Sequence, residues 1–235
     1  MQTRSGVVKE LRLISGGQRA AWIECALQGR PQPGQYLLGW ASEDTVAALA
    51  TPLFPGELAE DGFLAADIPT AWEPGTSLEL RGPLGHGFEL PAAARRLALG
   101  AIGGSLDRLM PLIRLGLERE MAVTLYIDHG PITLGDFALY LSSAVEIHPL
   151  ASLPEALSWA DLLALDLERQ DIHRLRLLLG GDGESRLPCP AQALIRTPLT
   201  CGGVADCGVC AVPGRRRWKP VCTDGPVFAL NELDW

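Results

Sequence analysis

The stretch that decides the fold is Cys201-Gly202-Gly203-Val204-Ala205-Asp206-Cys207-Gly208-Val209-Cys210, followed after eleven residues by Cys222. It places four cysteines in the pattern C-x5-C-x2-C-x11-C. Four thiolates at such spacing suit a tetrahedral zinc ion or a [2Fe–2S] cluster. The stretch therefore predicts a metal-binding lobe at the C-terminal end of the sequence.

The spacing within the motif favours the iron–sulfur cluster over zinc. Zinc sites usually pair two short C-x2-C knuckles, whereas only Cys207 and Cys210 are so close here. An extended loop that begins at Cys201 suits a two-iron cluster better than a single ion. Gly202, Gly203 and Gly208 permit left-handed turns and would bring backbone N–H groups near the sulfurs. Structural zinc and a set of reduced cysteines without metal remain the alternatives.

Composition excludes several classes of protein. The chain has 235 residues and a net charge of −8, which argues against a nucleic-acid binder or a protein of anionic membrane surfaces. No apolar run is long enough for a transmembrane helix, so we expect no membrane insertion. The first residues lack the apolar run of a secretory signal. We therefore expect a cytoplasmic protein whose clustered cysteines serve metal or redox chemistry rather than disulfides.

The first part of the chain, residues 1–92, predicts an antiparallel β-barrel. Short apolar runs alternate there with Gly/Pro turns, as in small barrels. The predicted strands cover residues 7–14, 20–27, 35–40, 62–68 and 77–80.

The remainder predicts two further lobes, which makes the fold class α+β with several lobes. Residues 93–187 alternate strand and helix patterns, typical of a small parallel α/β domain of the nucleotide-binding type. The predicted strands cover 96–101, 122–127 and the apolar run 175–179, and the predicted helices cover 106–120 and 154–165. Residues 188–235 form the cluster domain.

The C-terminal motif also resembles a known family. The cysteine loop together with Val221-Cys222-Thr223-Asp224-Gly225-Pro226-Val227-Phe228 is similar to the cluster domain of the electron-transfer subunit of type B dihydroorotate dehydrogenase, in the ferredoxin-NADP reductase superfamily. Three further landmarks extend the resemblance along the chain: Pro33-Gly34-Gln35-Tyr36, Gly82-Pro83-Leu84-Gly85-His86-Gly87-Phe88, and Gly100-Ala101-Ile102-Gly103-Gly104 before Met110-Pro111-Leu112.

The resemblance implies a ferredoxin-reductase-like arrangement of the three lobes and one [2Fe–2S] cluster. Its ligands, by match to the family motif, are Cys201, Cys207, Cys210 and Cys222. The first gap is one residue longer than in the family, which leaves Asp206 as an alternative oxygen ligand. In the family, electrons pass from dihydroorotate through FMN in a catalytic partner to the cluster, then through FAD to NAD. The resemblance thus implies a hetero-oligomer with a flavoprotein dehydrogenase.

The cofactor motifs of the other two lobes depart from the family. Its FAD strand Arg-Pro-x-Ser is represented by Thr51-Pro52-Leu53-Phe54, so Thr51 and Pro52 are weak FAD candidates. Asp67-Ile68-Pro69-Thr70 stands where the family has a phosphate-binding helix start. Asp107 near the glycine turn would repel a pyrophosphate. Gly180-Gly181-Asp182-Gly183 replaces the family's Cys-Gly-Pro segment. These departures argue against tight FAD binding and against NAD(P).

The leading hypothesis is an iron–sulfur electron-transfer subunit, an oxidoreductase component rather than an independent catalyst. The alternatives are a non-redox scaffold that has lost FAD and NAD, with a structural zinc, and a reductase with an altered FAD site. The basic run Arg215-Arg216-Arg217-Trp218-Lys219 is interpreted as a hairpin tip, with docking as its alternative role. Cys25 and Cys189 are interpreted as buried structural thiols.

Overall fold

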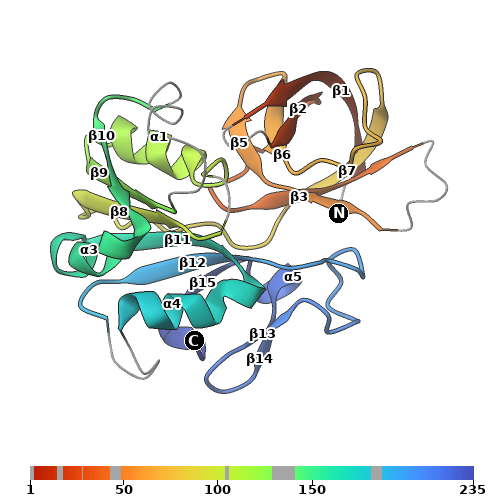
Figure 1. Ribbon diagram of the computed structural model, residues 1–235. Helices are drawn as coiled ribbons and strands as arrows, with labels where there is room; N and C mark the ends of the chain where they lie inside the picture. The colour runs from red at the N-terminus through yellow and green to blue at the C-terminus, as the bar shows by residue number, and fades with distance from the viewer. Residues whose placement is uncertain are drawn as a thin grey trace.

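The computed structural model describes residues 3–14, 18–27, 29–42, 49–103, 106–128, 141–180 and 187–235. Two sheets and a C-terminal lobe make up the molecule. An antiparallel barrel lies at the upper right of Figure 1, a parallel sheet with helices at the left, and the C-terminal lobe beneath both. This arrangement confirms the predicted fold class.

The barrel is a seven-stranded antiparallel sheet in the order β4-β3-β7-β1-β2-β6-β5. Its strands are β1 (Thr3–Leu13), β2 (Arg19–Glu24), β3 (Tyr36–Ala41), β4 (Thr51–Leu53), β5 (Pro55–Leu58), β6 (Gly62–Ala66) and β7 (Ser77–Leu84). The two edge strands, β4 and β5, are joined by Phe54 alone. Because adjacent residues cannot stand at opposite ends of a flat sheet, the sheet has to curl until its edges approach.

Strand β3 is apolar on both faces, and the structure shows why. Leu37 points into the barrel core. Tyr36 and Leu38 point outward into a second core that they share with the parallel sheet and the C-terminal lobe. Since side chains alternate along a strand, one face of β3 packs in the barrel core and the other face packs in the second core.

The second sheet has the strand order β10-β9-β8-β11-β12-β15. Its parallel strands are β8 (Arg96–Ala101), β9 (Ala122–Ile127), β10 (Val145–Pro149), β11 (Leu162–Glu168) and β12 (Ala191–Arg196), and β15 (Val227–Ala229) runs antiparallel at the edge. The order reverses between β8 and β11, the switch point at which open α/β sheets place their ligand crevice.

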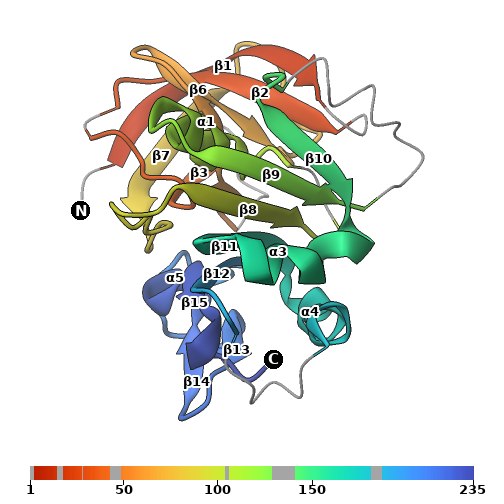
Figure 2. The ribbon, with the colours of Figure 1, turned by 90° about the vertical axis from the view of Figure 1, so that its left-hand side faces the viewer.

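Helices cover both faces of this sheet. Helix α1 (Met110–Glu118) packs on the face toward the barrel strand β5. Helices α3 (Leu153–Trp159) and α4 (Ile172–Leu179) cover the other face, together with part of the C-terminal lobe. Figure 2 shows α3 and α4 on the side of the C-terminal lobe.

Two predicted elements are wrong. The helix predicted over 154–165 ends at Trp159, and Leu162 begins the buried strand β11. The run 175–179, predicted as a strand, belongs to helix α4. Short apolar runs have no distinct period, so pattern alone cannot separate a buried strand from a helix segment.

The C-terminal lobe is closely joined to the sheet. It contains the hairpin β13 (Ala211–Pro213) and β14 (Trp218–Pro220), the turn α5 (Val221–Asp224) and the short helix η4 (Leu230–Glu232). Strands β12 and β15 both follow residue 187 yet lie in the parallel sheet. The predicted boundary at 187 therefore falls inside the sheet. In the part of the chain that the structure describes, every helix is too short or too polar to cross a membrane.

Candidate iron–sulfur centre

The four motif cysteines lie on the segment that follows strand β12 and ends in helix α5, next to Tyr36 of β3. Cys201 contacts Cys207, and Cys210 contacts Cys222. Cys210 and Cys222 are buried, Cys201 is half-buried and Cys207 is exposed. All four are free thiols. The site thus has an inner side formed by Cys210 and Cys222 and an outer edge at Cys207.

The loop from Cys201 to Cys210 turns through left-handed backbone conformations. The φ angles are +65° at Gly202, +79° at Gly203 and +67° at Gly208. Ala205 also adopts a φ of +60°, which an alanine adopts only at a cost. Sequence analysis anticipated the glycines and missed Ala205. Such turns aim consecutive N–H groups inward, as anion-binding nests do.

These N–H groups surround the sulfur of Cys201. The backbone N–H groups of Asp206, Cys207 and Val204 donate to that sulfur and lower the pKa of the thiol to about 6. Hydrogen bonds to the ionised form are what lower a pKa in this way. Cys201 is therefore prepared as a thiolate, the form that binds metal. Asp206 contributes through its backbone, and its side chain is exposed.

The buried thiol of Cys222 differs from that of Cys201. Burial, followed by a hydrogen bond to Cys210, raises the pKa of the Cys222 thiol to about 12. The Ala205 N–H also reaches Cys222, and Cys201 lies within electrostatic range of it. On the outer side, Thr200 Oγ1 is 3.2 Å from Cys207 Sγ. Among the described residues, no group of three His, Cys, Asp or Glu side chains has the spacing of a metal site.

Side chains remote in sequence hold the loop at three points. Arg81 of β7 donates to the Gly202 carbonyl. Arg169, in the short helix η3 (Arg169–Asp171), donates to the Val209 carbonyl at 2.7 Å. The Tyr36 hydroxyl of β3 donates to the Cys222 carbonyl at 3.3 Å. Sequence analysis missed all three, because nothing local in the chain connects them to the motif.

The remaining two cysteines lie outside the loop. Cys25 belongs to the barrel core, where burial raises its pKa to about 11. Cys189 is buried two residues before β12 begins, and burial raises its pKa as well. Both locations agree with the interpretation of these residues as structural thiols.

The weak FAD candidates lie at the edge of the barrel. Thr51 pairs with Gly39, and Pro52, which has no N–H to donate, pairs with Leu38. The next residue, Phe54, packs its ring 5.7 Å from that of Tyr36. An arginine that could grip a pyrophosphate is absent from the strand, and an apolar ring stands where the family has serine.

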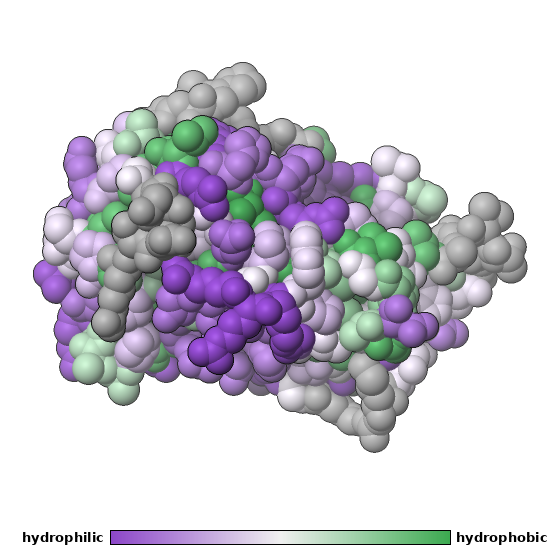
Figure 3. Space-filling view, turned by 90° about the horizontal axis from the view of Figure 1, so that it is seen from below, coloured by the Kyte–Doolittle hydropathy of each residue, from purple (hydrophilic) through white to green (hydrophobic). Residues whose placement is uncertain are grey.

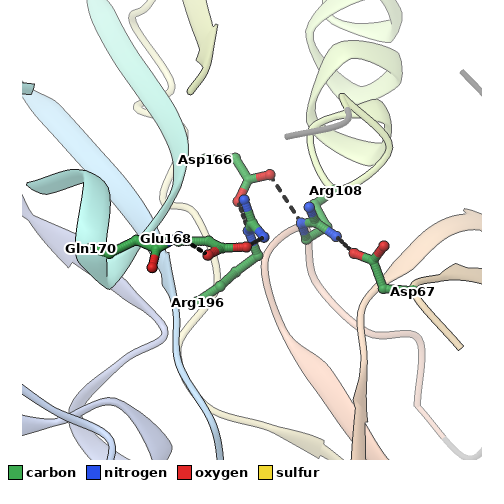
Figure 4. Close-up of polar contacts among 6 residues, drawn as sticks. All are labelled: Asp67, Arg108, Asp166, Glu168, Gln170 and Arg196. Carbon is green, nitrogen blue, oxygen red and sulfur yellow. Dashed lines mark hydrogen bonds and ion pairs between the residues drawn. The ribbon is translucent and has the colours of Figure 1, made fainter. Parts of the chain in front are cut away.

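A buried ion-pair network occupies the crevice at the switch point of the sheet. Arg108, 4% exposed, donates to Asp67 Oδ2 of the barrel at 2.7 Å and to Asp166 Oδ2 of β11 at 3.0 Å. Asp166 also accepts from Arg196 at 3.0 Å, and Arg196 in turn binds Glu168 (Figure 4). Burial works against the charge of Arg108, but Asp166 and Asp67 outweigh it and raise the pKa of the guanidinium.

The two cofactor sites thus fit differently. The cysteine loop offers thiols, inward N–H groups and a glycine cradle, which fit an iron–sulfur cluster. At the switch point of the sheet, where open α/β folds bind ligands, the guanidinium of Arg108 is already bound to Asp67 and Asp166. A Cβ on Gly56 would lie 2.9 Å from the Asp107 carbonyl, so β5 and the segment before α1 are in contact.

Solved structures with this fold define its class. The chain is similar to an NADH-dependent reduced ferredoxin-NADP oxidoreductase studied for flavin-based electron bifurcation, with a TM-score of 0.73, 17% identity, and coverage of 98% of this chain and 90% of that one. The ferredoxin reductase in carbazole 1,9a-dioxygenase is similar with a TM-score of 0.61 and 17% identity, and the match covers 77% of this chain and 66% of that one. A third similar structure is the flavohem-like FAD/NAD binding domain of nitric oxide dioxygenase from Vibrio cholerae O1 biovar El Tor. Its TM-score is 0.58 at 13% identity, and the match covers 82% of this chain and 99% of that one. The fold is ferredoxin-reductase-like.

The cluster lobe has a more specific match. Residues 200–234 match the family described as the iron-sulfur cluster binding domain of dihydroorotate dehydrogenase B. The resemblance seen in the sequence is therefore confirmed, and it is concentrated in the lobe that carries the four cysteines. No curated protein matches the chain.

Proposed function

We propose that this protein is an electron-transfer subunit that holds one [2Fe–2S] cluster on Cys201, Cys207, Cys210 and Cys222. Such a cluster supplies one-electron chemistry. The observation that carries the proposal is the loop itself: three N–H groups stabilise the Cys201 thiolate within a lobe that matches an iron–sulfur family. The protein's own contribution is to supply thiolates, to bury the inner pair and to expose the outer edge.

The filled crevice supports a carrier that works through partners. With Asp67, Arg108 and Asp166 bound to one another, the described residues at the switch point leave no free arginine to bind a pyrophosphate. Electrons would then enter and leave through other proteins. By resemblance to the dihydroorotate dehydrogenase family, we infer a flavoprotein dehydrogenase as one partner, in a cytoplasmic hetero-oligomer.

The docking face we propose is the outer edge of the loop. Val204 is 59% exposed, Val209 42% and Trp218 of the neighbouring hairpin 66%. Exposed apolar residues beside a redox centre suit a partner interface, since aromatic anchors dominate such surfaces. Figure 3 views the molecule from below, the side of the C-terminal lobe in Figure 1, and shows hydrophobic patches beside strongly hydrophilic side chains.

The basic residues of the hairpin have a structural role in addition. Arg217 binds Asp224 at 2.8 Å and Lys219 binds Glu232 at 2.7 Å. These pairs hold β14 against α5 and η4. We therefore assign the docking contribution to Trp218 and the two valines rather than to the basic run.

The test is anaerobic purification followed by iron, sulfide and zinc analysis with EPR of the dithionite-reduced protein. We expect two irons and two sulfides per chain and a [2Fe–2S] signal. Single Cys→Ala variants at 201, 207, 210 and 222 should lose the signal. Cys189→Ala, which is matched in residue type to all four and in burial to Cys210 and Cys222, should keep it. Stoichiometric zinc without sulfide would overturn the proposal in favour of the scaffold.

A further inference from the structure

Arg81 lies on the barrel but contacts the cluster loop. Along β7, Leu78 and Leu80 point into the barrel core, so Arg81 projects from the outer face. Its Nη2 donates to the carbonyl of Gly202, the residue after Cys201. Its Nε is buried and has no hydrogen-bond partner. A partly buried guanidinium, with a buried donor left over at Nε, therefore lies against the residue that follows the first cysteine of the motif.

The loop is shaped to receive this group. A Cβ on Gly203 would lie 3.2 Å from Arg81 Nη2 and 3.5 Å from the Tyr36 hydroxyl. Tyr36 is fully buried and donates to the Cys222 carbonyl. A side chain at position 203 would crowd Arg81 and Tyr36, so glycine suits this position best. The barrel thus supplies one wall of the site, with Arg81 at the Cys201 end and Tyr36 at the Cys222 end.

A cation in this position has an electrostatic consequence. A four-thiolate cluster is anionic, and reduction adds one more negative charge. A buried positive charge stabilises the reduced form more than the oxidised form, and low dielectric strengthens the effect. We propose that Arg81 is a positioning residue that orders the start of the loop and raises the reduction potential of the cluster. This inference rests on the proposed function.

Arg169 provides an internal comparison. It too donates to loop carbonyls, those of Val209 and Ala211 on either side of Cys210. Its side chain is exposed, so water and salt screen its charge. If hydrogen bonding to the loop alone set the potential, the two arginines would act alike. If shielding from water matters, the partly buried Arg81 has the larger effect on the potential.

The experiment is a potentiometric EPR titration of the intact protein and three variants. Arg81→Gln should lower the reduction potential of the cluster by about 59 mV. For one electron, this shift is a tenfold change in the equilibrium constant for electron exchange. Arg81→Lys should restore most of the wild-type value, and Arg169→Gln should shift it several times less than Arg81→Gln. An unchanged potential in Arg81→Gln, or equal shifts in the two Gln variants, would overturn the inference.

A second route avoids disturbing the loop. Thr3 is exposed and lies directly opposite Arg81 on β1. Thr3→Asp would place a carboxylate next to the guanidinium and should lower the potential, whereas the uncharged Thr3→Asn should not. Equal potentials in these two variants would count against the inference even where Arg81→Gln fails to load a cluster. A wild-type protein without any cluster would instead refute the proposed function.

Discussion

Arg108 donates through Nε to Asp166 Oδ2 at 3.0 Å, and the two side chains are 3% and 1% exposed. They join the segment before α1 to strand β11 at the switch point of the sheet. Through Asp67, the same guanidinium also reaches the barrel. One arginine therefore connects two lobes in the space where open α/β sheets bind ligands.

Breaking the inner pair should destabilise the protein more than breaking the outer one. Asp166→Asn leaves Arg108 and Arg196 without their shared buried carboxylate, and we expect a loss of about 3 kcal/mol in the free energy of unfolding. Asp67→Asn is the matched control, because the Asp67 side chain is 48% exposed and exposed pairs contribute about 1 kcal/mol or less. Urea denaturation measures both. Equal losses would show that burial of the pair is unimportant.

The filled crevice also predicts how the protein responds to FAD. We expect no flavin to be released on denaturing the purified protein and no rise in its melting temperature on adding FAD or NADH. A ligand at a hundred times its dissociation constant stabilises a protein by about 2.7 kcal/mol, so binding would be visible as a thermal shift. Iron content measured on the same sample serves as the control. A clear shift with FAD would establish the altered-site reductase instead.

Local patterns were sufficient for most of the barrel and for part of the sheet. Alternation and Gly/Pro turns predicted the strands around Leu37 and Leu80 because one face of each strand packs inside the barrel. The failures occurred at Leu162 and Leu175. Leu162 begins a buried strand of the sheet, and Leu175 belongs to a helix that packs on the sheet. In both cases the sequence shows only a short apolar run, which has the same pattern in a strand and in a helix.

The candidate site divides in the same way. Gly202 and Gly203 lie within the motif, and their left-handed conformations follow from its spacing and residue type. Tyr36 and Arg81 are more than a hundred residues away along the chain. Their role depends on how β3 and β7 of the barrel pack on the C-terminal lobe, a relation that one sequence does not contain.

Asp161 gives a prediction on acid stability. Its carboxylate accepts the Arg96 side chain and the backbone N–H groups of Arg95 and Arg96, which lowers its pKa from 3.8 to about 2. A depressed folded-state pKa stabilises the protein above the unfolded value and loses that contribution as the pH falls. Asp161→Asn should therefore be less stable than the wild type at pH 7, and the difference should narrow between pH 4 and pH 2. A constant difference down to pH 2 would contradict this assignment.

The exposed edge of the loop predicts the effect of surface charge on electron exchange. Val209→Glu places a charge on the proposed docking face, and a carboxylate that docking would bury without a partner opposes binding, at an expected cost of about 1.4 kcal/mol. We expect reduction by a flavoprotein dihydroorotate dehydrogenase to slow about tenfold at subsaturating concentration, measured by stopped-flow absorbance. Leu13→Glu is the matched control, because Leu13 is 73% exposed at the far end of β1 on the barrel. Dithionite, which needs no docking face, should reduce both variants at the wild-type rate. Equal slowing in the two variants would place the partner elsewhere.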